Sequence, residues 1–153
     1  MLDKAMVIWY FIYASKRICA YFIEVDMEEF VNFFKGLSDK TRLRIIWLLQ
    51  KANTRLCVCE IMDSLNENQY NVSRHLRILK SEEFLKEEKE GRWVYYSLAN
   101  PKSHFQELIF EAVSSLPEKI FYEESKRLKK RLALRENGKC VEGMKSEECY
   151  KID

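Results

Sequence analysis

A mainly α-helical fold with one β-hairpin is predicted by three features of this 153-residue sequence. The composition is that of a globular chain, with 47% hydrophobic and 33% charged residues, and the 4 glycines and 2 prolines favour helices over strands. Apolar residues recur with the 3.6-residue period of helices along most of the chain. Residues 93–98 alternate with a period of two instead, which is typical of a strand. The length suits one domain with a full core.

Residues 1–26 are expected to be an N-terminal extension, and the native start could be Met27. Residues 5–14 are apolar or aromatic, residues 15–17 interrupt them with two cations, and residues 18–23 are apolar again. Each run is shorter than the roughly 20 residues of a membrane-spanning helix, and a signal peptide would carry its positive charge before the apolar run. We therefore expect no membrane partner. An added dimer helix and an interfacial anchor are the alternatives.

Two helices are expected at the start of the domain. Asp26 is a candidate N-cap of the first, with Glu29 as its reciprocal partner. Apolar residues follow at i, i+3, i+4 and i+7, namely Phe30, Phe33, Phe34 and Leu37. Gly36 and residues 38–39 mark a break. Residues 43–49 are apolar on most sides, so the second helix should lie at the centre of the core.

Residues 69–80 are expected to form a helix with two different faces. Val72, Leu76 and Leu79 fall on one core-facing stripe, and Asn68 is a candidate N-cap. The first turn and the remaining surface carry the candidate DNA contacts Gln69, Tyr70, Asn71, Ser73, Arg74, His75 and Arg77. Three cations without a carboxylate let the helix approach phosphates, although the net charge of the chain is only +2. His75 lies beside the apolar stripe, so orienting the helix is its alternative role.

The neighbouring segments complete a winged helix-turn-helix. A short helix at residues 57–65 and a polar turn at 66–68 precede the helix just described, which is the helix-turn-helix arrangement. Residues 84–89 and 92–98 then form a β-hairpin, with Gly91 in the turn. Cations expected near its tip could contact the DNA backbone or minor groove: Lys86, Lys89 and Arg92. Interleaved carboxylates should weaken them: Glu82, Glu83, Glu87, Glu88 and Glu90.

The C-terminal third should contain two more helices. Residues 100–101 are expected to open the first, whose long apolar stripe over residues 105–116 needs a partner. A second copy of the chain would supply it, giving a symmetric homodimer. The last helix, residues 118–136, should expose a basic face to solvent before a polar, mobile tail. Residues 27–116 thus form the DNA-binding and dimerisation domain, and residues 117–153 a C-terminal helix and Cys-containing tail.

The five cysteines favour a cytoplasmic protein with reduced thiols. Cys57 and Cys59 are two apart while Cys19, Cys140 and Cys149 are scattered, unlike a secreted disulfide framework. At the start of the 57–65 helix, the helix dipole should lower the thiol pKa of the close pair. Positions i and i+2 of a regular helix point about 200° apart, so a ligand bound by both would distort this turn. The alternative is that both are small buried hydrophobic residues.

From residue 27 to about 116 the sequence resembles the ArsR family of metalloregulatory repressors. The matching stretches are residues 37–45 (LSDKTRLRI), 56–61 (LCVCEI), 72–76 (VSRHL) and 91–96 (GRWVYY). Each stretch alone is weak evidence for the family, but the occurrence of all four in this order is highly specific. The resemblance implies a homodimer that binds palindromic double-stranded operator DNA and leaves it when a ligand binds.

The resemblance also implies As(III) or Sb(III) as the inducer and Cys57 and Cys59 as its ligands, because this motif carries the inducer thiols in arsenic-responsive members. Met62 occupies the position of a further family cysteine, so a third donor would be Cys19, Cys140, Cys149 or solvent. Zinc sensing would need more ligands than His104 and Glu107 provide. The alternatives are a redox-sensing repressor, a sensor of another soft metal with the same fold and, remotely, a thiol enzyme.

Overall fold

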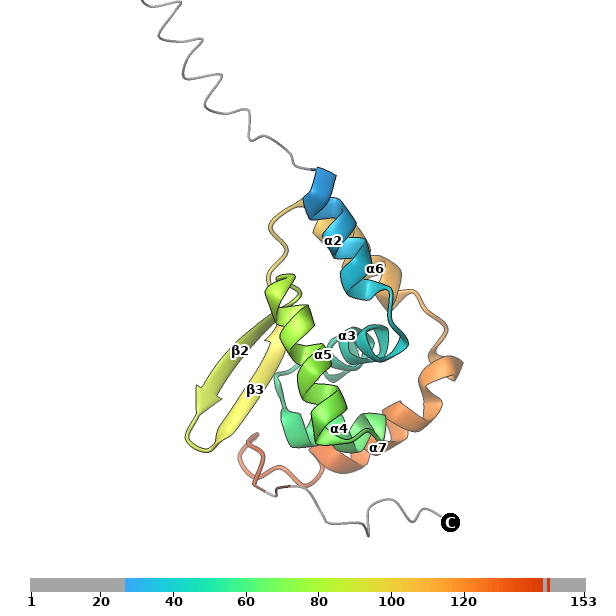
Figure 1. Cartoon of the computed structure of the whole chain (residues 1–153). Coiled ribbons are helices and arrows are strands. Elements are labelled where there is room, and N and C mark those ends of the chain that lie inside the picture. The colour runs from blue at the N-terminus through green and yellow to red at the C-terminus, as the bar shows by residue number, and fades with distance from the viewer. Residues whose placement is uncertain (1–26, 142, 144–153) are drawn as a thin grey trace, which may run out of the picture. The chain divides into compact units, whose positions relative to one another are not determined.

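The structure, a computed structural model, describes residues 27–141 and 143 (Figure 1). Its elements are α2 (Met27–Leu37), α3 (Lys40–Ala52), β1 (Leu56–Cys57), α4 (Val58–Leu65), α5 (Gln69–Ser81), β2 (Leu85–Glu90), β3 (Trp93–Leu98), α6 (His104–Ser114), the 3-10 helix η1 (Glu118–Phe121) and α7 (Tyr122–Leu132). The predicted helical fold with one hairpin is therefore confirmed. Asp26 and the rest of the N-terminal extension lie outside the described residues. Because the chain divides into compact units after residue 32, the packing below concerns Phe33 onward.

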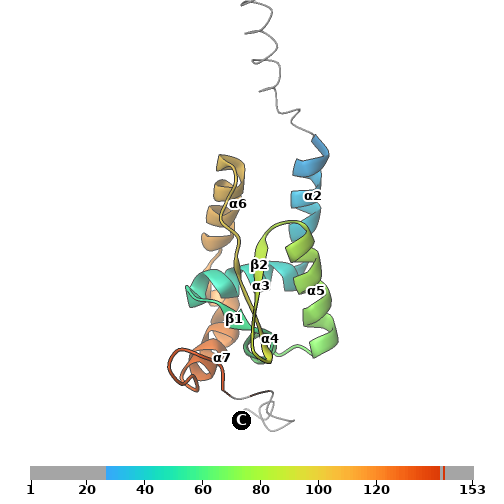
Figure 2. The ribbon, with the colours of Figure 1, turned by 90° about the vertical axis from the view of Figure 1, so that its left-hand side faces the viewer.

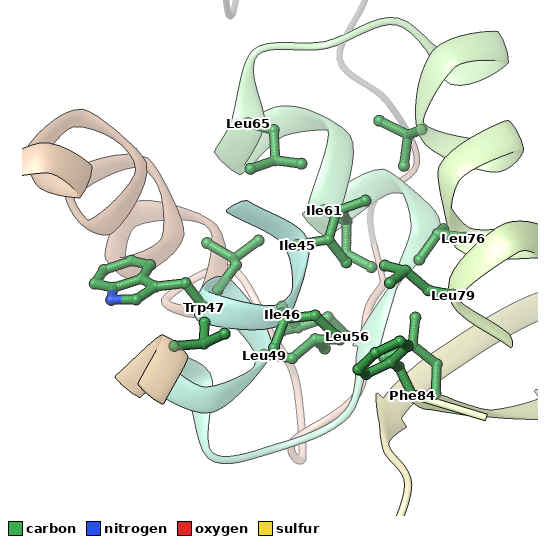
Figure 3. Packing of buried hydrophobic residues seen from close by; sticks show 14 of the residues in the cluster. Ile45, Ile46, Trp47, Leu49, Leu56, Ile61, Leu65, Leu76, Leu79 and Phe84 are labelled. Carbon is green, nitrogen blue, oxygen red and sulfur yellow. The ribbon is translucent and has the colours of Figure 1, made fainter. Parts of the chain in front are cut away.

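Helix α3 lies at the centre of the core, as its sequence predicts. Asp39 caps it by accepting a hydrogen bond from the Arg42 backbone N–H at 3.0 Å, and the helix ends at Asn53 in the left-handed conformation. The five residues Ile45–Leu49 are all buried. Leu56, Ile61, Leu65, Leu76, Leu79 and Phe84 pack in the same hydrophobic cluster (Figure 3). Burial on all sides explains why the apolar residues of this helix form no single stripe.

Helices α4 and α5 form the helix-turn-helix. Helix α4 ends at Asn66, which takes the left-handed conformation, and Asn68 caps α5 by accepting the Asn71 backbone N–H at 2.8 Å. The predicted stripe of α5 is confirmed, since Val72, Leu76 and Leu79 are completely buried. The two helices thus share one core, and a displacement of α4 would be transmitted to α5.

The sheet has three antiparallel strands in the order β1-β3-β2. Strands β2 and β3 pair from Leu85 opposite Leu98 to Glu90 opposite Trp93, and Gly91 supplies the positive φ of 59° that the turn needs. Strand β1 is only two residues long and is not predicted from the sequence. It places Cys57 opposite Tyr95 of β3. In Figure 2, α5 lies on one side of the hairpin and β1 on the other.

Helix α6 begins three residues later than the Pro101 signal predicts. Ser103 is its N-cap and accepts the Gln106 backbone N–H at 3.4 Å, so Pro101 lies before the helix. Only part of its apolar stripe is covered within the chain, because Val113 is buried while Leu108 is 48% exposed. Phe34, which is 57% exposed, stacks edge-on against Phe105 of this stripe. An exposed apolar surface formed by Phe34 and Leu108 therefore remains.

Helix α7 packs against α4 (Figure 1). The prediction that its basic side chains are exposed to solvent is wrong at two positions. Arg131 is buried, with its Nε 3.2 Å from Oδ2 of Asp63, and the Nε of Arg127 donates to the Ser64 carbonyl at 2.9 Å. The exposed basic side chains of this helix are those of Lys126, Lys129 and Lys130. Sequence periodicity misses this docking because arginine is usually a surface residue. No helix within residues 27–141 is long and apolar enough to cross a bilayer.

The segment after α7 also differs from the expected mobile tail. Residues Glu136 and Lys139 exchange two backbone hydrogen bonds across a turn in which Asn137 and Gly138 have positive φ. This turn reverses the chain and brings Cys140 back onto the sheet, where it is 4% exposed. Cys149 lies outside the described residues, as does Cys19.

Candidate functional site

Six of the seven candidate DNA contacts on α5 share its accessible side. Gln69, Arg74 and Arg77 are exposed, Tyr70 is 81% exposed, and Asn71 and Ser73 are partly exposed. The Nδ2 of Asn71 donates to the Glu67 side chain at 3.0 Å, which orients this amide in the first turn. The accessible side carries cations, amides and hydroxyls, the groups that contact phosphates and base edges.

His75 is separated from this set. It is 4% exposed, and its Nδ1 lies 3.5 Å from Oδ1 of Asp39, the N-cap of α3. Burial lowers the pKa of His75, although the neighbouring Asp39 carboxylate opposes this. A buried imidazole packed beside the N-cap of α3 does not project toward a ligand. The alternative role considered for His75 therefore fits the structure, and direct contact with DNA does not.

The wing places one of its three cations differently from the prediction. Lys89 and Arg92 lie near the tip, but Lys86 pairs with Ser97 close to the base of the hairpin. The Arg92 guanidinium lies 4.7 Å over the Trp93 ring and donates to the Val141 carbonyl at 3.4 Å. Arg92 is thus partly engaged with the C-terminal segment.

Several wing glutamates are paired with cations of the same chain. Arg55 forms ion pairs with Glu88 and Glu90, Lys139 pairs with Glu90, and Lys80 lies 3.0 Å from Glu87. These pairs reduce the repulsion between the wing and phosphates below what the sequence suggests.

A cluster of three thiols lies at the start of α4. Cys57 is 1% exposed and its thiol is hydrogen-bonded with those of Cys59 and Cys140. The Cys57 and Cys140 sulfurs and a carboxylate oxygen of Glu60 all lie within 4.8 Å of one another. The Tyr95 hydroxyl accepts the Cys140 backbone N–H at 3.1 Å, and Cys59 packs against the same cluster. Residues from β1, α4, β3 and the segment after α7 therefore build one site, called here the thiol cluster.

The thiols do not have the lowered pKa predicted from their place at a helix start. The hydrogen bond with Cys59 and burial raise the pKa of the Cys57 thiol, and burial raises that of Cys140. The nearby carboxylate of Glu60 acts in the same direction on both. The prediction failed because β1 and the C-terminal segment exclude water from this helix end.

The predicted geometric conflict between Cys57 and Cys59 is also absent. Cys57 is not a helical residue: it is the N-cap of α4, with φ −78° and ψ 163°. The Cys57 thiol is hydrogen-bonded to that of Cys59 while α4 remains regular from Val58 to Leu65. A ligand therefore need not unwind α4 to reach both sulfurs.

Glu60 links the thiol cluster to α7 and was not identified from the sequence. Its Oε2 accepts the Cys57 backbone N–H at 2.8 Å, which closes a capping box. The Arg135 guanidinium binds both carboxylate oxygens, at 2.7 and 2.8 Å, and Glu60 is 1% exposed. Both carboxylate oxygens are therefore paired with Arg135, and one of them also accepts the hydrogen bond of the helix cap. The detectable signals were the glutamate three residues after the cap and the i, i+4, i+8 spacing of Arg127, Arg131 and Arg135.

His104 forms a surface pair with Glu107, whose Oε2 lies 3.1 Å from its Nδ1. Both side chains are more than half exposed, so the pair lies at the surface. Among the described residues, a group of three side chains able to hold a metal ion is formed by Cys57, Glu60 and Cys140. The chemistry of that group is dominated by sulfur, because Glu60 is already bound by Arg135.

A helix-turn-helix followed by a two-stranded wing defines the class of winged helix-turn-helix DNA-binding proteins. Residues 39–87 match the family described as "Bacterial regulatory protein, arsR family". Over 75 residues the chain is 40% identical to an uncharacterized HTH-type transcriptional regulator of Methanocaldococcus jannaschii, covering 49% of this chain and 83% of that protein. The chain belongs to the arsR family of bacterial regulatory proteins.

Further relatives are named for arsenic resistance or for cadmium resistance. The chain is 48% identical over 71 residues to the arsenic resistance transcriptional regulator ArsR2 of Pseudomonas putida, covering 46% of this chain but only 60% of that protein. It is 39% identical over 79 residues to a cadmium resistance regulatory protein CadC homolog of Staphylococcus aureus, covering 52% and 63%. The fold resembles reduced HlyU of Vibrio cholerae, with 26% identity, a TM-score of 0.52, and coverage of 61% of this chain and 94% of that one.

Proposed function

We propose that the chain is a transcriptional repressor that binds operator DNA as a homodimer and leaves it when As(III) or Sb(III) binds Cys57 and Cys59. The observation that carries this proposal is the convergence of thiols at the N-terminus of α4, the helix that supports α5. Similarity to regulators named for arsenic resistance supports the same inducer.

DNA binding is assigned to the accessible side of α5 and the tip of the wing. The contacts proposed are Gln69, Tyr70, Asn71, Ser73, Arg74, Arg77, Lys89 and Arg92, with Lys86 limited to backbone phosphates if DNA reaches the base of the hairpin. The uncovered apolar surface at Phe34 and Leu108 supports a symmetric dimer. Two α5 helices in successive major grooves require half-sites about 34–36 Å apart.

The choice of a soft inducer rests on the donor atoms. Thiolates favour soft ions, whereas carboxylates favour harder ones. A harder ion that required Glu60 would have to displace Arg135 from both carboxylate oxygens. An ion bound through the thiols of Cys57 and Cys59 leaves the ion pair between Glu60 and Arg135 intact.

Release follows from the packing between the two helices. Ile61 and Leu65 of α4 lie in the same buried cluster as Leu76 and Leu79 of α5. A ligand that shifts the first turn of α4 must therefore repack this cluster or move α5. Allosteric coupling of about 1–3 kcal/mol would weaken operator binding roughly 5- to 150-fold.

Operator titration with and without arsenite tests the proposal. Arsenite should weaken operator binding by the wild-type protein within that range, and Cys57→Ser or Cys59→Ser should abolish the response. Cadmium, tested in parallel, separates the arsenic and cadmium alternatives. If arsenite still releases the Cys57→Ser protein, these ligands are wrong.

A redox response is the second candidate, favoured by the hydrogen bond between the Cys57 and Cys140 thiols. Peroxide would oxidise Cys57 to a sulfenic acid with loss of water, and Cys140 would displace a second water to form a disulfide. Burial and the raised pKa of both thiols oppose this reaction, because the thiolate is the reactive form. Release by peroxide without arsenite, reversed by a reductant, would support this candidate instead.

A further inference from the structure

The segment after α7 is held at the thiol cluster by contacts on several sides. The Cys140 backbone donates to the Tyr95 hydroxyl, and the Arg131 guanidinium reaches the Cys140 sulfur at 3.8 Å. Arg131 also donates to the Gly143 carbonyl at 3.2 Å. The turn at residues 136–139 reverses the chain just before Cys140. Cys140 is therefore placed beside Cys57 by the fold.

We propose that Cys140 supplies the third sulfur for the inducer, so that one chain holds As(III) in a three-thiolate site joining the start of α4 to the segment after α7. This inference rests on the proposed function, in which Cys57 and Cys59 are the other two ligands. It assigns to the C-terminal segment a part in ligand binding.

The remaining nearby donors are poorer. Met62 is buried, but its thioether cannot form the covalent bond that a thiolate makes with arsenic. Both carboxylate oxygens of Glu60 are bound by Arg135 and one also accepts the Cys57 N–H. Cys140 already lies with its sulfur within 4.8 Å of that of Cys57. Cys59 lies outside the group whose ligand atoms are all within 4.8 Å of one another, so three As–S bonds also require the Cys59 thiol to move toward the other two sulfurs.

The reaction is balanced without an oxidant or a base. Arsenous acid, As(OH)3, condenses with three thiols to give As(S-Cys)3 and three waters. Three As–O bonds and three S–H bonds break, while three As–S bonds form and each hydroxide leaves with a thiol proton. Arsenic stays in the +3 state. The product is neutral, which suits a buried site because a net charge there would be costly.

A regulatory consequence follows from the position of Cys140. Arg135 and Arg131 already connect the C-terminal part to α4 through Glu60 and Asp63. A three-thiolate site would add covalent bonds between the same parts at the helix end nearest the wing. Ligand binding would then act on α4 from both its own first turn and the C-terminal segment.

X-ray absorption spectroscopy of the arsenite-loaded full-length protein counts the sulfur ligands. The wild type and a Cys19→Ser/Cys149→Ser variant should both show three sulfurs, since the variant retains only Cys57, Cys59 and Cys140. The Cys140→Ser variant should show two sulfurs and one oxygen. The mass that arsenic adds to this variant, relative to its own arsenic-free form, should also exceed the wild-type gain by the one water that is not expelled. Loss of this direct ligand should raise the arsenite concentration for half-release from operator by at least the roughly 10-fold that loss of an outer-shell partner costs, each variant being compared with its own arsenite-free operator affinity.

Two sulfurs in the Cys19→Ser/Cys149→Ser variant would overturn the inference, whether or not Cys140→Ser folds. Three sulfurs in Cys140→Ser would overturn it as well, by moving the third ligand to Cys19 or Cys149. Either result, with operator release retained, leaves the proposed function intact. Failure of arsenite to bind the wild type at all would instead contradict the proposed function itself.

Discussion

At the scale of single residues, Glu60 connects the cap of α4, the thiol cluster and α7. A carboxylate this deeply buried depends on its partners, here the bidentate Arg135 guanidinium and the Cys57 N–H. We predict that Glu60→Gln lowers the free energy of unfolding by about 3–5 kcal/mol, because it leaves Arg135 without its countercharge. Urea unfolding measures the change. The matched control is Glu118→Gln, which breaks the exposed pair with Lys51 and should leave the free energy of unfolding nearly unchanged. Equal effects would refute the role of Glu60.

The raised thiol pKa values predict how protons accompany ligand binding. Because the pKa of Cys57 and of Cys140 lies above the ordinary thiol value, both are protonated near pH 7. Arsenous acid removes these protons as water, so arsenite binding should release almost no protons to the buffer. The affinity for arsenite should therefore vary little between pH 6 and 8. A divalent cation must expel them, so cadmium affinity should rise with pH. Calorimetry in buffers of different ionisation enthalpy measures the number of protons released with each ligand. Substantial proton release with arsenite would contradict the assignment of protonated thiols to the site.

The residue contacts of the thiol cluster could be predicted only in part. The LCVC motif identified Cys57 and Cys59 from the sequence alone. Cys140 was one of three candidates, because its approach depends on α7 docking against α4 through buried arginines. The pKa direction was wrong for a related reason: burial by distant segments outweighed the helix dipole at this position.

At the scale of secondary-structure elements, periodicity predicted α5 and the hairpin correctly, and the apolar run at residues 43–49 predicted α3. Strand β1 was missed because two residues carry no detectable alternation, and its pairing with Tyr95 and Tyr96 is distant in sequence. The start of α6 was misplaced because Pro101 is a favoured residue both at a helix start and in the turn before it. Local signals thus predicted the long elements, while contacts between distant residues determined the short ones.

The arginines and the polar residues on the accessible side of α5 are predicted to contribute differently to DNA binding. Arg74→Ala and Arg77→Ala should each weaken operator binding and reduce the salt slope by about one if each neutralises one phosphate. Gln69→Ala and Ser73→Ala should mainly relax sequence preference, by roughly 1–3 kcal/mol at the base pairs they contact. Titrations against operator and scrambled DNA at several salt concentrations distinguish the two classes. Unchanged salt slopes for both arginine variants would remove them from the interface.

At the scale of the whole molecule, the uncovered apolar surface predicts the oligomeric state. Leu108→Glu and Phe34→Glu place a charge on this surface and should shift the protein toward monomer, because the dimer would have to bury it. Leu134→Glu is the control, since Leu134 is also exposed but follows α7. Sedimentation equilibrium reports the outcome. Dimers that persist in both surface variants would place the interface elsewhere.

The central claim is that one homodimer both binds operator DNA and loses it through thiol-bound arsenite. Sedimentation velocity of a fluorescent operator duplex with the full-length protein measures stoichiometry and release together. We expect a complex of two chains per operator that dissociates when arsenite is added, while the protein itself stays dimeric and Cys57→Ser stays bound. A complex that is unaffected by arsenite, or that contains a single chain, would contradict the account.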